Sequence, residues 1–77
     1  MISMRDLHPG EKGRICGFKP GDPGYRRQLL AMGLTPNACF EVIRRAPLGD
    51  PIEICVRDFY LSLRQSEADL LKIERVT

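Results

Sequence analysis

The sequence predicts a mostly β protein: a small, strongly bent antiparallel barrel of about five short strands, with one short α-helix inserted between the first two. The chain has 77 residues, which is enough for a single domain over residues 1–77 with one small core. Its turn residues, 7 Gly and 6 Pro, are spread along the whole length. Several short stretches alternate apolar and polar residues, whereas helical spacing of apolar residues is clear in one place.

The first strand is expected over residues 12–18, where apolar residues lie between two turns. The turn before it is His8-Pro9-Gly10, and residues 19–24 (KPGDPG) follow it. Because Pro and Gly interrupt strand pairing, they mark both ends of this strand.

One helix is predicted to begin at Asp22-Pro23 and to run to about Met32. The Asp22 carboxylate suits the first free amides, and Pro23 lacks only a donor that would stay unpaired. Gly33 supplies the left-handed residue that ends the helix. Helical spacing places three apolar side chains on one buried face: Tyr25, Leu29 and Met32.

The second strand is expected over residues 39–45, after a turn at residues 35–38. Pro36 and Asn37 hold the second and third positions of that turn, which is typical of type II because Asn tolerates positive φ. Apolar residues occur on both faces of the strand, so both are expected to be covered: Phe40 and Val42 on one face, Cys39 and Ile43 on the other.

Residues 52–57 alternate cleanly and predict a half-buried third strand. The inward side chains of this strand are Ile52, Ile54 and Val56, and the outward ones are Glu53, Cys55 and Arg57. The same pattern then turns three more side chains inward: Phe59, Leu61 and Leu63.

The C-terminal part is expected to form one helical turn and a last short strand. Ser66–Asp69 resembles a capped turn, in which the Ser66 hydroxyl accepts an amide hydrogen and Asp69 reaches back. The strand follows over residues 71–73.

Residue types predict no enzyme, no cofactor and no metal site. Twelve basic and ten acidic residues give a net charge of +2, which is too weak and too mixed to favour a nucleic-acid partner. His8 is the one histidine, so a Cys–His or Ser–His catalytic set has no other base. Paired cysteine spacings are absent, and we expect the cysteines to fill unrelated strand positions: Cys16, Cys39 and Cys55.

The same features point to the cytoplasm. An odd number of widely spaced cysteines, three, is unlike a secreted disulfide scaffold. The first residues lack the apolar core of a signal peptide, and no stretch approaches the roughly 20 apolar residues that cross a bilayer. We therefore expect a soluble cytoplasmic protein.

The loop at residues 46–51 carries the best candidate for a binding residue. Pro47 and Pro51 stiffen a hairpin tip that holds Leu48, for which the alternation offers no core position. Leu48 either anchors a partner or folds back to cap one end of the barrel. The sequence leaves these two alternatives open.

Three segments carry a family resemblance: residues 27–36 (RQLLAMGLTP), 46–52 (APLGDPI) and 61–68 (LSLRQSEA). In this order they resemble the FeoA family, the small cytoplasmic proteins of bacterial ferrous iron uptake. The resemblance implies an SH3-like barrel with an inserted helix. Asn37 stands where the family typically has Gly, and the three cysteines do not belong to the family pattern.

The resemblance further implies a non-enzymatic accessory of FeoB, the membrane transporter with a cytoplasmic GTP-binding domain. We expect the chain to dock on that domain and to modulate transport or the GTP cycle, meeting the membrane only through the transporter. The expected contacts lie at the hairpin tip and around the helix end: Leu48, Gly49 and Asp50, with Arg27, Met32 and Leu34.

Two other hypotheses remain at this stage. One is a transition-metal-binding module that uses the three cysteines, and the other is a relative of the SH3-like domain of iron-dependent repressors. A small core and an exposed apolar tip would also favour a homo-oligomer.

Overall fold

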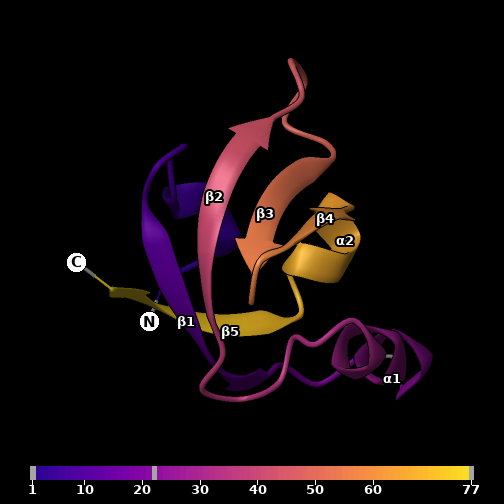
Figure 1. The fold of residues 1–77 in the computed structure, drawn as a ribbon. Helices are drawn as coiled ribbons and strands as arrows, with labels where there is room; N and C mark the ends of the chain where they lie inside the picture. Colours follow the sequence, from indigo (N-terminus) through magenta and orange to yellow (C-terminus); the bar gives the residue numbers. More distant parts are fainter. Residues whose placement is uncertain (1, 22, 77) are drawn as a thin grey trace.

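Alternating apolar and polar residues form five strands: β1 (Lys12–Phe18), β2 (Cys39–Arg45), β3 (Ile52–Val56), β4 (Phe59–Leu63) and β5 (Leu71–Val76). The other elements are the 3₁₀ helix η1 (Met4–Asp6) and the α-helices α1 (Pro23–Ala31) and α2 (Gln65–Ala68). The computed structural model describes residues 2–21 and 23–76 (Figure 1). The predicted fold class is confirmed, and β5 runs three residues further than the sequence indicated, to Val76.

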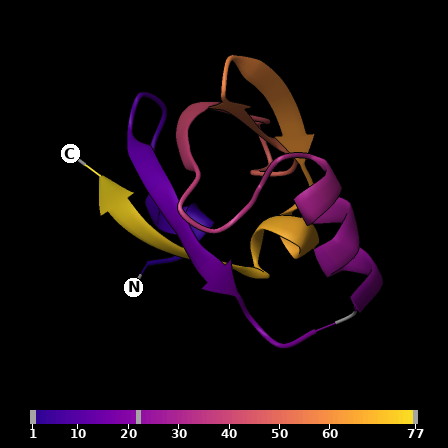
Figure 2. The same cartoon turned by 60° about the horizontal axis from the view of Figure 1, so that its bottom comes forward.

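The strands form one antiparallel sheet in the order β4-β3-β2-β1-β5. Bulges between Ile15 and Gly17 in β1 and between Val42 and Arg44 in β2 bend it. The end strands β4 and β5 do not pair, so backbone hydrogen bonds do not close the barrel. The helices α1 and α2 lie on the side of the sheet where β4 and β5 remain unpaired (Figure 2).

The core collects the inward side chains of every strand and of α1. The predicted inward residues of β3 are all buried, as are Phe40 and Val42. A Cβ on Gly13 would lie 2.6 Å from Cζ of Phe40, so the sheet needs glycine where β1 crosses this ring. The fully buried large side chains are Met4, Leu7, Ile15, Leu29, Leu34, Ile52, Ile54, Leu63, Leu71, Ile73, Val42 and Val56.

Helix α1 begins at Pro23 and ends as predicted at a left-handed Gly33, whose φ is 91°. The Gly33 N–H donates to Leu30 O at 3.0 Å, and the Leu34 N–H donates to Leu29 O at 3.1 Å. This pair of bonds is a Schellman motif, in which the residue after the glycine packs against the last turn. Leu29 and Leu34 are accordingly both buried. The predicted cap at Asp22 lies outside the described residues.

The turns before β1 and β2 lie where they were predicted, and the turn before β2 has the predicted conformation. Asn37 has φ 73°, and the Ala38 N–H donates to Thr35 O at 3.0 Å, which closes the turn before β2. Before β1, the Glu11 N–H donates to His8 O at 2.9 Å, with Gly10 at φ 91°.

Two aromatic residues predicted to be inward are exposed. Phe59 is 71% exposed because it begins an end strand, where no further strand covers it. Tyr25 is 42% exposed because α1 meets the core through its C-terminal half, at Leu29 and Met32.

The predicted cap of α2 was placed two residues too late. The helix begins at Gln65, and Glu67 reaches back so that its Oε1 accepts the Arg64 N–H at 2.9 Å. Glu67 therefore has the role that the sequence assigned to Asp69. Of the helices in residues 2–21 and 23–76, none is long and apolar enough to cross a membrane.

Candidate docking site

The loop between β2 and β3 forms the rigid hairpin tip at the top of Figure 1. The Gly49 N–H donates to Ala46 O at 2.7 Å, and the Ala46 N–H donates to Pro51 O at 3.0 Å. Pro47 fixes φ at the second position of the inner turn, and Gly49 accommodates a φ of 83°. Backbone hydrogen bonds therefore close the turn at the tip.

Leu48 stands at the corner of this turn with 96% of its surface exposed. The alternative that Leu48 folds back over the core is therefore wrong. No other large apolar residue among those described is exposed to this degree. An apolar side chain on a stiff turn loses little conformational entropy when a partner covers it.

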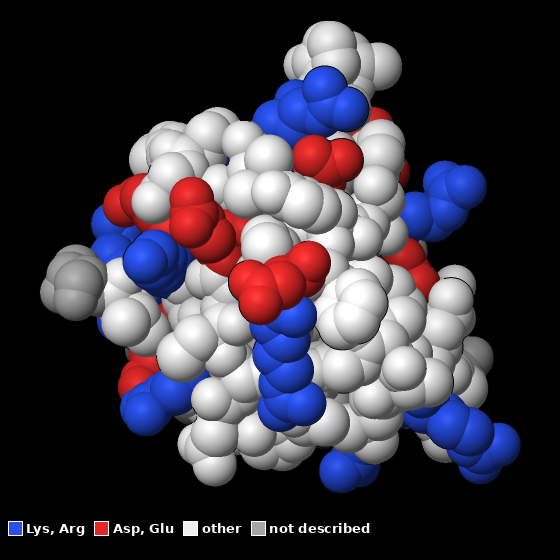
Figure 3. Space-filling view, in the orientation of Figure 1, with Lys and Arg blue, Asp and Glu red and all other residues white. Residues whose placement is uncertain are grey.

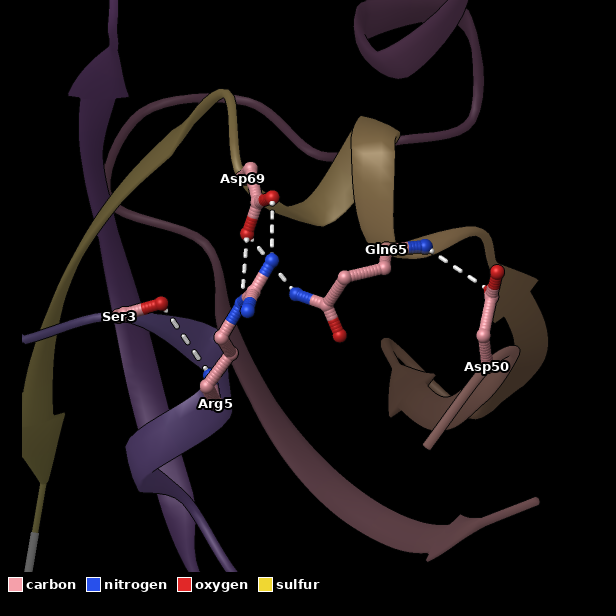
Figure 4. A network of polar contacts seen from close by, with 5 residues as sticks. All are labelled: Ser3, Arg5, Asp50, Gln65 and Asp69. Atoms are coloured by element: carbon pink, nitrogen blue, oxygen red, sulfur yellow. Dashed lines mark hydrogen bonds and ion pairs between the residues drawn. The ribbon is translucent and has the colours of Figure 1, made fainter. Parts of the chain in front are cut away.

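Asp50 is exposed, but its carboxylate is bonded to α2. Its Oδ1 accepts a hydrogen bond from the Gln65 N–H at 3.0 Å, which caps the first turn of α2 (Figure 4). Asp50 therefore ties the loop to α2 and positions Leu48. Sequence analysis missed this role, although Arg64 at the N-cap of α2 makes no side-chain cap hydrogen bond and so left a donor for another residue.

The same network continues to η1 through side chains of α2. The Gln65 Nε2 donates to Asp69 Oδ1 at 2.8 Å, and the Arg5 NH2 group lies 3.1 Å from Asp69 Oδ2. The hydrogen bond from Arg5 lowers the pKa of Asp69 below its usual value, and the bond from Gln65 acts in the same direction. Figure 4 shows this path from the loop at Asp50 to Ser3 and Arg5.

A shallow groove of about 320 Å³ lies directly beside the tip. Arg44 lines it, with its Nε 3.7 Å from Glu53 Oε1 and most of its surface free. Arg45 is already engaged, because it donates to Met4 O at 2.5 Å and to Leu7 O at 2.7 Å. The lining residues are Arg44, Arg45, Ala46, Pro47, Pro51, Glu53 and Ser62.

The residues predicted around the helix end do not join the tip. Helix α1 lies at the opposite end of the molecule from the hairpin (Figure 1). Arg27 is exposed and Met32 half-buried, but Leu34 is fully buried in the Schellman motif and offers no surface. A second groove connects Met32 to the base of the loop, with the lining Gln28, Met32, Pro51, Ser62, Arg64 and Glu67.

The cysteines line neither the groove beside the hairpin tip nor the groove at Met32. Cys39 and Cys55 line one shallow depression on the outer face of β2 and β3, whereas Cys16 lies on β1 and is exposed. Across residues 2–21 and 23–76, no group of three or more His, Cys, Asp or Glu residues is placed to hold a metal ion. Basic and acidic side chains are interleaved over the face in Figure 3, and the end of the hairpin is uncharged.

The sequence is similar to part of a larger known protein. A curated relative is the Fe(2+) transport protein A/Fe(2+) transporter FeoB fusion protein of Porphyromonas gingivalis, 28% identical over 76 residues. The match covers 99% of this chain and 9% of that protein, so the chain corresponds to a small part of it.

Two solved structures show the same architecture. The FeoA-like protein of Clostridium acetobutylicum is 30% identical, with a TM-score of 0.88 over 99% of this chain and 87% of that one. The FeoA of Stenotrophomonas maltophilia, solved with zinc and described as a prokaryotic SH3 domain protein, is 17% identical. Its TM-score of 0.81, over 96% of this chain and 91% of that one, confirms the SH3-like fold.

A family model, the FeoA domain, matches residues 2–75. This range includes the Gly33 helix end, the loop that carries Leu48 and all five strands except the last residue of β5. The chain therefore belongs to the FeoA family.

Proposed function

We propose that this chain is a non-enzymatic accessory of ferrous iron uptake that docks on the cytoplasmic GTP-binding part of FeoB. Docking modulates transport or the GTP cycle of the transporter. Leu48 is the apolar anchor of the contact, and Gly49 and Asp50 hold it in position. Arg44 beside the tip faces a carboxylate of the partner.

Membership of the FeoA family supports the role in ferrous iron uptake. The Porphyromonas gingivalis relative supports the choice of partner, because its name joins transport protein A and FeoB in one fusion protein. Two functions held in one polypeptide meet at a high effective concentration, so an intrinsic contact between them can be weak.

The observation that carries the proposal is the exposure of Leu48, at 96%, on a turn fixed by its own backbone hydrogen bonds. Apolar anchors at the centre of an interface, surrounded by polar groups, commonly carry most of the binding energy. The tip has this arrangement, because the groove beside it presents Arg44 and Glu53.

The test is an NMR titration of the labelled chain with the soluble cytoplasmic GTP-binding domain of FeoB, in both nucleotide states. We expect saturable shifts at residues 46–51, and we expect Leu48→Asp to weaken binding by about thirtyfold or more. GTP hydrolysis by the domain, measured in the same samples, reports the effect on the cycle.

Phe59→Ser is the matched control, because Phe59 is also an exposed apolar residue but lies beyond the other end of β3. It should leave the affinity unchanged. Thermal unfolding checks that Leu48→Asp stays folded, with a change within about 0.5 kcal/mol as for other surface substitutions. Unchanged affinity in a folded Leu48→Asp variant would exclude the tip as the docking site.

A further inference from the structure

Strand β4 has an open edge, in contrast to the other end of the sheet. At the far end, Ile2 bridges to β5 and donates its N–H to Ile73 O at 2.9 Å. At the near end, β4 pairs with β3 on one side and with no described strand on the other. The backbone groups on that outer side therefore have no strand partner within residues 2–21 and 23–76.

The turn between β3 and β4 determines which backbone groups point outward. Arg57 and Asp58 have φ of 50° and 69°, and the first strand pair after them is Val56 with Phe59. This is a two-residue hairpin, in which the pair next to the turn is hydrogen-bonded and the pattern then alternates. The N–H and C=O groups of Tyr60 and Ser62 consequently face the open edge.

Nothing in β4 protects this edge from pairing. Natural end strands commonly carry charges or proline, but β4 (FYLSL) has neither. Phe59 is 71% exposed and Tyr60 68% exposed. An uncharged, partly apolar strand with free backbone groups is a template for another strand.

We propose that β4 pairs antiparallel with β4 of a second copy of this chain, about a two-fold axis through Leu61. The flanking charges specify this partner. Asp58 and Arg64 border β4 at its two ends, and both are exposed. Neither forms an ion pair within the described residues. Antiparallel pairing centred on Leu61 sets Asp58 of each copy opposite Arg64 of the other.

The hydrogen-bond pattern is compatible with the same register. Centring on Leu61 sets Tyr60 of each copy opposite Ser62 of the other, and these are the residues with outward backbone groups. A shift by one residue would lose both the backbone bonds and the charge pairs. The backbone pattern also allows shifts by two residues, and the flanking charges select the alignment centred on Leu61 among these.

The same register also gives the exposed side chain of Phe59 a contact with the second copy. In the same register, Phe59 of one copy lies opposite Leu63 of the other. The neighbours of Leu63 in the chain, Ser62 and Arg64, line a groove between β4 and α1. Gln28 and Met32 form the α1 side of that groove. A phenyl ring beside the thioether of Met32 is a favourable contact. Each copy offers one ring and one groove, as a two-fold interface requires.

The first experiment combines sedimentation equilibrium with amide hydrogen exchange on the full chain. We expect a monomer–dimer equilibrium, with exchange at Tyr60 and Ser62 slowing about tenfold when a mostly dimeric sample is concentrated a hundredfold. The amides of Phe59, Leu61 and Leu63 face β3 and should be protected at every concentration. A chain that stays monomeric at millimolar concentration contradicts the proposal, and so does a dimer with unprotected Tyr60 and Ser62.

The second experiment tests the register by exchanging charges. Asp58→Lys and Arg64→Glu each set like charges opposite one another twice, so each should raise the dimer dissociation constant by about tenfold. The double variant restores opposite charges and should recover the affinity. Failure of the double variant to recover, with all three variants folded, overturns the proposed alignment.

Leu48→Asp distinguishes this proposal from the docking proposal. Leu48 lies outside the β4 interface, so this variant should dimerise like the parent chain even where it no longer binds the transporter domain. Protection of Tyr60 and Ser62 by the GTP-binding domain of FeoB, in a chain that remains monomeric alone, would assign the edge to the transporter and exclude the second copy.

Discussion

At the scale of single residues, Asp69 shows how an exposed ion pair contributes to stability. Its carboxylate accepts hydrogen bonds from Arg5 and Gln65, and the bond from Arg5 lowers its pKa below the usual value near 3.9. A carboxyl whose pKa is lower in the folded state stabilises the fold above the unfolded pKa. The contribution disappears as the pH falls through the lowered pKa.

We therefore expect Asp69→Asn to be less stable than the parent chain at pH 7. The difference should shrink as the pH falls below about 4, where the native carboxyl also becomes protonated. Urea unfolding across this pH range measures it. The pair is exposed, so 1 M salt should reduce the difference as well. A difference that is the same at pH 7 and pH 2 would contradict this origin.

The sequence predicted the surroundings of some candidate site residues better than those of others. Leu48 lies in a stiff loop that offers no core position. The sequence therefore left two alternatives, an exposed anchor and a cap over the barrel, and the structure shows that the side chain is exposed. Leu34 was predicted as a contact but is buried, because the residue after a helix-ending glycine packs against the last turn. The internal role of Asp50 depends on α2, which is distant in sequence, so local patterns contain little signal for it.

At the scale of elements, the end of α1 is set by Gly33. Its φ of 91° costs a residue with a Cβ about 1 kcal/mol or more, although nothing lies within 4 Å of the position that this Cβ would take. Gly33→Ala should therefore destabilise the fold by about 1 kcal/mol through the backbone alone, whereas Gly33→Asn should cost less because Asn tolerates this conformation. Chemical denaturation measures both, and equal costs would point to a contact rather than to φ.

Strands were predictable where one face is buried and the other is solvated. The alternation in β3 fixed its register, and the paired residues of β2 and β4 confirm it. The prediction was wrong for Phe59 because alternation reports which face a residue occupies but not whether a neighbouring strand covers it. Strand order is a long-range property, so the open edge of β4 became visible only in the folded chain.

At the scale of the whole molecule, the two proposed surfaces border β3 in different ways. The hairpin tip lies beyond the start of β3, whereas β4 runs alongside the whole strand. The hairpin with Leu48 precedes this strand, and the turn with Asp58 and the start of β4 follow it. Docking on a transporter and pairing with a second copy thus use different residues, and neither surface uses the three cysteines. The family resemblance indicated the fold and the class of partner, but it contains no information on the geometry of either contact.

A matched pair of truncations separates the contribution of the core from that of the proposed docking surface. Ile54 is fully buried and pairs with Val42 and Leu61, while Leu48 has the same number of side-chain carbons but is 96% exposed. Ile54→Ala should destabilise the fold by about 2–5 kcal/mol, and Leu48→Ala by no more than about 0.5 kcal/mol. A chain of this size is stable by only a few kcal/mol, so Ile54→Ala should be largely unfolded at 37 °C. Calorimetry and urea titration of both variants measure the difference, and a cost near zero for Ile54→Ala would show that this face of β3 is not the core.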